Sequence, residues 1–249
     1  MLREERLQFI LEKLSTHQKV SSGELMELLN VSEGTIRRDL NELEEKGLLR
    51  KVYGGAVPKP EAPPYFENRV QYASQGKEQL AQKAVRFIKN GQTILIDGGT
   101  TNWHIARQIP ENLELTVFTN SIPIANELSE HPLITLFMLG GRVFKGSKIT
   151  YGPEVADGVK TLRADLGFIG IRSIHAEAGA TTLDYEEAYI KRLMVERSGQ
   201  VIVAATQDKL NTADHYLICG CDAIDTLIVE DGMAEESLVP YQKFSMEIL

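Results

Sequence analysis

The sequence is poor in cysteine and has no apolar run long enough to cross a membrane. Its 249 residues include only two cysteines, Cys219 and Cys221. Two thiols cannot form a disulfide framework, and a lone C-x-C without a second ligand pair is a poor metal site. We expect two small side chains on opposite faces of a strand. The acidic N-terminus is unlike a signal peptide. These absences predict a cytoplasmic protein with no membrane anchor, metal or cofactor.

The chain also lacks an excess of positive charge, since its net charge at pH 7 is −8. This balance excludes a general coat protein for nucleic acid, but it permits a specific reader whose affinity depends on local charge placement. Residues 1–57 carry nine Lys and Arg against ten Asp and Glu, so most of the negative charge lies in the remainder. The length suits two domains.

The first 57 residues have the pattern of a winged helix-turn-helix domain. Apolar residues recur at helical spacing over about residues 3–15. A capping box at Ser21–Glu24 opens a second helix, and Ser32 caps a third helix with an apolar stripe. Residues 48–57 then indicate a strand, a Gly-Gly turn and a second strand, which is the pattern of a wing.

The third helix presents side chains suited to reading DNA. Thr35, Arg37 and Arg38 lie near its start, opposite the apolar stripe. Arginine donates two hydrogen bonds at once to guanine, and hydroxyls at a helix N-terminus suit phosphate. The alternative is an ordinary helical bundle whose arginines pair with nearby acids such as Asp39 and Glu42. The predicted DNA-binding residues are Ser32, Thr35, Arg37, Arg38, Arg50, Lys51 and Tyr53.

The composition changes after the wing. Four prolines fall within residues 58–64, so we expect residues 58–76 to form an extended linker. Over residues 77–249, strand and helix patterns alternate, which implies a parallel sheet covered on both faces. The predicted strands are 93–96, 115–118, 134–139, 166–171, 201–205 and 226–229, and the predicted helices are 78–89, 102–108, 122–130 and 186–197.

A glycine and threonine loop lies between the first of these strands and the next helix. Gly98 and Gly99 permit a tight turn with exposed N–H groups. Thr100 and Thr101 add hydroxyl donors at the positive end of the helix dipole. No Gly-Lys-Ser/Thr follows, so the loop is not a nucleotide-triphosphate loop. Although any strand-to-helix turn can use glycine, the combination predicts an anion cradle, most naturally for phosphate.

Two further polar loops follow predicted strands. Asn120 and Ser121 follow one strand, and Gly140 and Gly141 follow the next. In an open parallel sheet, ligands lie beyond the carboxyl ends of the strands, so these loops should converge on one pocket. Lys209, shortly after residues 201–205, could supply a cation for a phosphate, with a solvated surface lysine as the alternative.

These motifs resemble the DeoR-type family of bacterial sugar-responsive repressors. The cue is Val-Ser-x-x-Thr-Ile-Arg-Arg-Asp-Leu from Val31, then Leu-x-x-Lys-Gly-Leu-Leu and the Gly-Gly-Ala of the wing. The similarity runs on through the second domain. It implies binding of a double-stranded DNA operator, modulated by a phosphorylated sugar, with a sensor domain similar in fold to sugar-phosphate isomerases. Half-site recognition predicts a homo-oligomer, dimer or tetramer.

The resemblance also implies roles for individual residues. In that family an Asp-Gly-Gly-Thr-Thr loop holds the phosphate, and it matches here at Asp97–Thr101. A lysine in an Asp-Ser-Ser-Lys motif assists, but here Thr-Gln-Asp precedes Lys209. Asp165, Gly170 and Glu187 fall where the family carries Asp, Gly and Glu. The resemblance therefore adds Asp97, Glu187 and Lys209 to the predicted effector site.

The alternative is a sugar-phosphate isomerase or deaminase fused to a DNA-binding domain. Such an enzyme needs a base beside the sugar, for which Glu187 and Asp165 are candidates. However, the residues after Asp165 form a buried strand without an acidic loop, and Glu186, Glu187 and Lys191 more simply form a solvated helix face. His104, like the other histidines, is expected at the surface or in a loop. We predict a regulator without turnover; a pure interaction module would bind no ligand.

Overall fold

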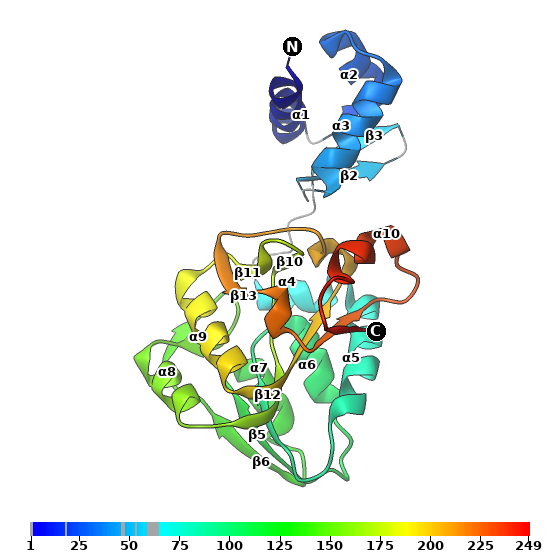
Figure 1. Ribbon diagram of the computed structural model, residues 1–249. Helices are drawn as coiled ribbons and strands as arrows, with labels where there is room; N and C mark the ends of the chain where they lie inside the picture. The colour runs from blue at the N-terminus through cyan, green and yellow to red at the C-terminus, as the bar shows by residue number, and fades with distance from the viewer. Residues whose placement is uncertain (1, 18, 46–47, 53, 59–64) are drawn as a thin grey trace. The chain divides into compact units, whose positions relative to one another are not determined.

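The computed structural model describes residues 2–17, 19–45, 48–52, 54–58 and 65–249 (Figure 1). The chain forms two compact units, Met1–Glu61 and Ala62–Leu249. The predicted fold class is confirmed, since a winged helix-turn-helix unit precedes a parallel α/β unit. No helix in the described ranges is both long enough and apolar enough to span a membrane.

The first unit contains three helices and a small antiparallel sheet. Its elements are α1 (Arg3–His17), β1 (Val20–Ser21), α2 (Ser22–Leu29), α3 (Glu33–Glu45), β2 (Leu49–Val52) and β3 (Gly55–Pro58). Strand β3 pairs with β2 to form the wing hairpin and also with β1, which was not predicted because two residues show no periodicity. Leu25, Ile36 and Leu43 are fully buried in the core of this unit.

Local side-chain bonds fix the helices of the first unit. The Ser21 hydroxyl accepts a hydrogen bond from the Glu24 N–H at 3.1 Å, so the predicted cap of α2 is confirmed. Arg6 on α1 donates from Nε and Nη2 to the two carboxylate oxygens of Asp39 on α3, at 2.6 and 2.9 Å. This bidentate pair is largely buried and joins α1 to α3.

The second unit is built on a parallel sheet of order β15-β14-β12-β9-β4-β5-β6. Its strands are β4 (Thr93–Ile96), β5 (Leu115–Thr119), β6 (Ile134–Met138), β9 (Ala164–Phe168), β12 (Ser198–Ala205), β14 (Thr226–Val229) and β15 (Glu247–Ile248). Strands after β4 extend the sheet in one direction, and strands after β9 extend it in the other. The boundary between β4 and β9 is therefore the topological switch point, where ligands bind in open α/β sheets.

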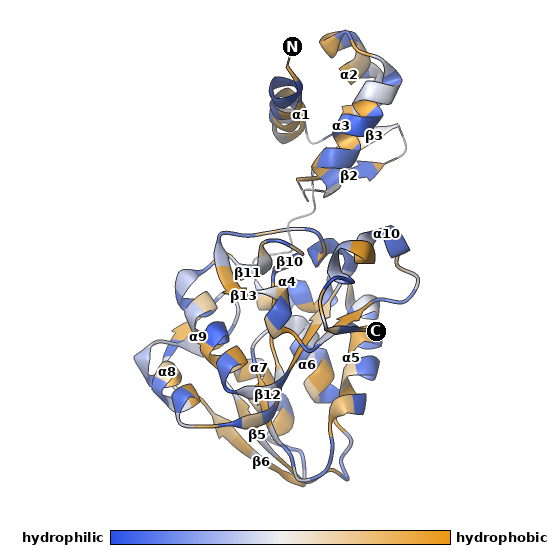
Figure 2. Ribbon diagram, in the orientation of Figure 1, coloured by the Kyte–Doolittle hydropathy of each residue, from blue (hydrophilic) through white to orange (hydrophobic). Residues whose placement is uncertain are grey.

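Helices cover both faces of this sheet, as the alternating pattern predicted. The covering helices are α5 (Ser74–Ala84), α6 (Thr100–Arg107) and α7 (Ile122–Leu128) on one face, and α8 (Pro153–Lys160) and α9 (Tyr185–Glu196) on the other. Val201 and Val203 of β12 pack toward α8 and α9, whereas Ile202 packs toward α5 and α6. Figure 2 shows helices such as α5 and α8 with one hydrophobic and one hydrophilic side.

Short elements between the parallel strands were not predicted, because they carry little periodicity. They are the hairpin of β7 (Arg142–Phe144) and β8 (Ile149–Tyr151), the antiparallel strands β10 (Ser173–His175), β11 (Gly179–Thr182) and β13 (Tyr216–Cys219), and α10 (Glu235–Leu238). The expected extended segment 58–76 also contains helix α4 (Phe66–Gln71) and the start of α5, so that expectation is wrong from Phe66 onward. Buried Phe66 anchors α4 by stacking edge-on against Trp103.

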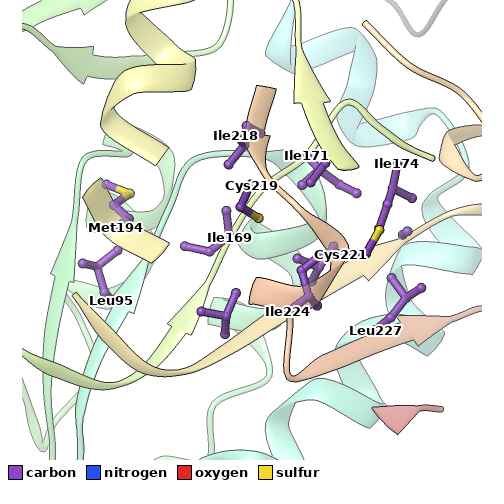
Figure 3. Close-up of a cluster of buried hydrophobic side chains, with 14 of the residues drawn as sticks. Leu95, Ile169, Ile171, Ile174, Met194, Ile218, Cys219, Cys221, Ile224 and Leu227 are labelled. Atoms are coloured by element: carbon purple, nitrogen blue, oxygen red, sulfur yellow. The ribbon is translucent and has the colours of Figure 1, made fainter. Parts of the chain in front are cut away.

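The two cysteines are free and buried in one apolar cluster (Figure 3). The expected placement on opposite faces of a strand is wrong, because β13 ends at Cys219 and Cys221 begins a 3-10 turn. Burial raises the pKa of Cys219 to about 12 and that of Cys221 to about 11. Over the described ranges, no group of three or more His, Cys, Asp or Glu side chains is placed to hold a metal ion.

We expect Asp39→Asn to lower the free energy of local unfolding of α1 by about 2 kcal/mol, because it leaves Arg6 without its ionised partner. The value is below that of a fully buried pair since Arg6 keeps some solvent contact. Hydrogen exchange of the α1 amides in the full chain measures it. Glu42→Gln is the control, since its partner Arg3 is exposed and the loss should stay within about 1 kcal/mol. Equal effects of the two substitutions would contradict the prediction.

Candidate functional site

The start of α3 has the geometry expected of a recognition helix. The Ser32 hydroxyl accepts a hydrogen bond from the Thr35 N–H at 3.3 Å and lies 3.0 Å from the Thr35 hydroxyl. Arg37 and Arg38 are both exposed. Arg38 donates from Nε to the Gly34 carbonyl at 3.0 Å, whereas Arg37 makes no hydrogen bond or ion pair with the described residues. The Arg37 guanidinium therefore keeps its donors available.

The competing arrangement, in which nearby acids neutralise these arginines, is not observed. Asp39 pairs with Arg6, and Glu42 pairs with Arg3. Within the described part of the chain, neither Arg37 nor Arg38 forms an ion pair. Asp39 and Glu42 of α3 thus bind residues of α1 instead.

The wing gives a mixed result for the predicted DNA contacts. Arg50 lies on β2 opposite Val57 of β3. Lys51 is tied to α3, because its backbone N–H donates to Glu44 at 2.7 Å and its ammonium donates to Asn41. Tyr53 lies outside the described residues. Ser32, Thr35, Arg37 and Arg38 are therefore presented together, while Lys51 is engaged within its own unit.

In the second unit, three of the predicted loops meet at the carboxyl edge of the sheet. The Gly98 N–H donates to the Asn120 side-chain oxygen at 3.2 Å. Asn120 in turn donates to the Thr150 carbonyl at 3.1 Å, and the Thr150 hydroxyl donates to the Leu139 carbonyl. The loops after β4, β5 and β6 are thereby connected. Ser121 is fully buried and caps α7.

Asp97 lies at the switch point and is held by an ion pair that the sequence did not reveal. Its carboxylate contacts the ammonium of Lys191 on α9, and it accepts the Gly170 N–H at 2.9 Å. Lys191 also lies 3.1 Å from Glu187, which accepts a hydrogen bond from Thr182. The expectation of a solvated Glu186–Glu187–Lys191 face is wrong for Lys191, which is only 2% exposed.

The electrostatics of this pair follow from its surroundings. Burial alone would lower the pKa of Lys191, but attraction to Asp97 and Glu187 outweighs burial and raises it. The protonated form of Lys191 is therefore favoured, and two acidic side chains face this one ammonium. Burial also raises the pKa of Asp97.

Glycine is required at two positions of this edge. A Cβ on Gly170 would lie 2.3 Å from the Gly98 carbonyl oxygen, so β9 and the β4 loop approach too closely for a side chain. Gly99 has φ +138° and precedes α6, where it frees the backbone N–H groups of the helix start. Thr100 and Thr101 form the first turn of α6, and the Thr101 hydroxyl has no hydrogen-bond partner among the described residues.

Gly140 and Gly141 lie further along the rim and are exposed, at the start of β7. A Cβ on Gly141 would meet the Tyr151 carbonyl oxygen at 2.7 Å, which explains the glycine by hairpin packing. Between the described residues, no hydrogen bond joins this pair to the 98–101 loop. Their part in binding a ligand stays a prediction.

Basic side chains gather around Lys209 on the opposite side of the switch point. Burial lowers the pKa of Lys209 to about 8. The charge of Asp208 opposes this shift, whereas the charges of Arg69, Lys191 and Arg172 add to it. Burial likewise lowers the pKa of Lys77 to about 8, with Lys209 as the next cause. Like charges that depress each other's pKa create a positive potential, so this cluster favours an anion.

Several residues of this site were missed, each for a definite reason. Arg69 and Lys77 lie in or beside the segment read as a linker. Arg172 follows β9 at the same edge as the other loops, so the strand-end rule could have found it. It lies 3.6 Å from Asp214. Asn102 donates to the carbonyls of Asp97 and Phe168 and so ties the loop after β4 to the end of β9.

Two other expectations are corrected. Asp165 lies near the amino end of β9, where it is exposed and accepts the Thr93 N–H at 2.8 Å, so it is remote from the carboxyl edge. His104 is 4% exposed on α6 rather than at the surface. Burial lowers the pKa of His104, and its Nε2 has no partner among the described residues.

Both units match known protein families. Residues 6–60 match the DeoR-like helix-turn-helix domain, and residues 73–231 match the DeoR C terminal sensor domain. The chain belongs to the DeoR family. It is thus a DNA-binding transcriptional regulator, and this DeoR-family chain combines the reader helix and the sensor sheet described above.

Individual relatives span nearly the same length. The chain is 32% identical to the transcriptional repressor GlcR of Bacillus subtilis, over 92% of this chain and 89% of that protein. It is 31% identical to the glycerol-3-phosphate regulon repressor of Escherichia coli, over 84% and 83%. A ribose 5-phosphate isomerase structure from Methanocaldococcus jannaschii matches 55% of this chain and 54% of that chain, with 15% identity and a TM-score of 0.41.

We expect the affinity of the full chain for inorganic phosphate to fall as the pH rises through about 8. Lys209 attracts the anion only while its ammonium is protonated, and its pKa is about 8, so each further pH unit should cost up to about tenfold in affinity. Isothermal titration calorimetry from about pH 7 to about pH 9.5 measures this. Lys209→Arg should flatten the decline, because guanidinium does not titrate there. An affinity that stays constant across pH 8 would remove Lys209 from the site.

Proposed function

We propose that this chain is a transcriptional repressor of a carbohydrate operon. We further propose that a phosphorylated sugar, bound at the carboxyl edge of the sheet, controls its affinity for operator DNA. One observation carries the proposal: Lys209 follows β12 and the glycine and threonine loop follows β4, so both lie at the carboxyl edge of the same parallel sheet. Unmatched cations, free helix N–H groups and hydroxyls are the donors that phosphate requires. The repressor names of the relatives are consistent with this function.

The effector-binding roles divide between contact and support. Phosphate would accept hydrogen bonds from the backbone N–H of Gly99, from Thr100 and Thr101, and from Lys209. Gly98, whose N–H donates to Asn120, would shape the loop. Asp97 and Glu187 repel an anion, so their role is to hold Lys191 in place. Asn120 and Ser121 shape the adjoining loop, and Gly140 and Gly141 would contact the sugar.

A regulator without turnover fits the carboxylates better than an isomerase does. Proton abstraction needs a base that is free to accept a proton beside the sugar. Glu187 and Asp97 are both committed to Lys191, and Asp165 lies at the other end of its strand. Incubating the protein with pentose and hexose phosphates tests this point, since steady product formation would favour an enzyme.

The regulatory step requires that the effector prefer one arrangement of the protein over another. A homo-oligomer, dimer or tetramer, would place two winged helices on two DNA half-sites. Effector binding would then alter the spacing of the α3 helices, and operator affinity would change by the difference in effector affinity between the two arrangements.

We expect Arg37→Ala to weaken binding to the operator by roughly 1–3 kcal/mol and to relax sequence choice, because an unpaired guanidinium reads a base edge. Duplexes selected by the wild-type protein from a random pool provide the operator, and fluorescence anisotropy at fixed salt measures affinity. Lys19→Ala removes an exposed charge from the same unit and should weaken all duplexes about equally. Unchanged affinity and selectivity would exclude Arg37 from the reader.

We expect the double variant Thr100→Ala and Lys209→Ala to keep operator affinity but to lose the response to phosphorylated sugars, because it removes a hydroxyl donor and a cation from the cradle. The same anisotropy assay, with a series of pentose and hexose phosphates, gives the measurement. A wild-type effector present at a hundred times its Kd should also stabilise the protein by roughly 2.7 kcal/mol. If the double variant still responds to a phosphorylated sugar, Thr100 and Lys209 do not bind the effector.

A further inference from the structure

Helix α4 brings a basic side chain to the sensor site from the chain segment that leads to the DNA-binding unit. Arg69 lies on this helix, which is the first described element after residue 58. Its Nη2 donates to the hydroxyl of Ser147, between β7 and β8, at 3.1 Å. Its Nε is buried and has no hydrogen-bond partner among the described residues. Arg69 forms no ion pair there either, so its charge is uncompensated by direct contact.

Such a guanidinium needs an explanation, because burying an unpaired cationic donor is costly. Glu187 is close enough to raise the pKa of Arg69, but its oxygens are taken by Lys191 and Thr182. Burial and the charge of Arg172 lower that pKa. The natural partner for the free Nε–H is an anion that arrives from outside the chain.

The position of α4 is fixed by contacts with the same rim. The Phe66 N–H donates to the Gly146 carbonyl at 2.8 Å, and the Phe66 ring meets Trp103 of α6 at 6.3 Å between centroids. The ammonium of buried Lys77 donates to the carbonyls of Arg69 and Tyr72, which closes the end of the helix. Helix α4 therefore packs against α6 through Phe66 and Trp103.

We propose that Arg69 is a ligand of the effector's phosphate and that α4 is the element through which occupancy of the site acts on the chain leading to the DNA-binding unit. The inference rests on the proposed function, since it assumes a phosphate at this rim. A planar guanidinium whose Nε–H has no partner among the described residues suits a phosphate, and its engagement would hold α4 more tightly against β7, β8 and α6. Release of the phosphate would loosen the same helix.

The test compares Arg69→Gln with Arg86→Gln, a control that removes an exposed arginine from the same unit. Isothermal titration calorimetry of the full chain uses inorganic phosphate, ribose 5-phosphate and glucose 6-phosphate. We expect Arg69→Gln to weaken the best of these probes about 10- to 100-fold and Arg86→Gln to leave it unchanged. Arg69→Lys should fall between, because it keeps the charge but not the fork.

A second measurement separates a ligand from a merely structural residue. Hydrogen exchange of the α4 amides should slow when the wild-type protein binds phosphate, and it should not respond in Arg69→Gln at a probe concentration that saturates the variant. Equal affinity in the wild type and Arg69→Gln would overturn this inference and leave the proposed function standing. Failure of the wild type to bind any probe would overturn the proposed function itself, and this inference with it.

Discussion

The ion pair between Asp97 and Lys191 is the contact on which the sensor unit depends. It joins the loop after β4 to α9, and through the Gly170 N–H it also reaches the end of β9. The pair thus fastens the two halves of the sheet at the point where their strand order diverges. A buried ion pair stabilises little by itself, because desolvation offsets attraction. Its value here is positional, since it fixes the loop that presents Gly98 to Thr101.

The same pair determines which charges are left for a ligand. Asp97 and Glu187 satisfy Lys191 and leave Lys209 and Arg69 without a carboxylate of their own in the described contacts. The site therefore combines two acidic side chains around Lys191 with basic side chains around Lys209. Burial and the neighbouring positive charges lower the pKa of Lys209, and a bound anion would raise it again.

The sequence predicted most of the regular elements and the strand-end loops, because they depend on periodicity and local chemistry, but it did not predict α8 or β15. Strands β4 and β14 have the predicted bounds, and Ser21 caps α2 as expected. The pattern could not predict that Lys191 is buried, since a Glu–Lys spacing of four is the same on a solvated helix and a buried one. The pattern also did not place Arg69 on a helix, because the six residues of α4 are too few to show a helical period.

The burial of Cys219 and Cys221 determines how these thiols respond to oxidants. The thiolate is the form that oxidants attack. Both cysteine side chains are buried, and burial raises the pKa of Cys219 to about 12 and that of Cys221 to about 11. Neither thiol should therefore react readily with peroxide or with other disulfides. These two cysteines therefore give this DNA-binding regulator no readily oxidised thiol.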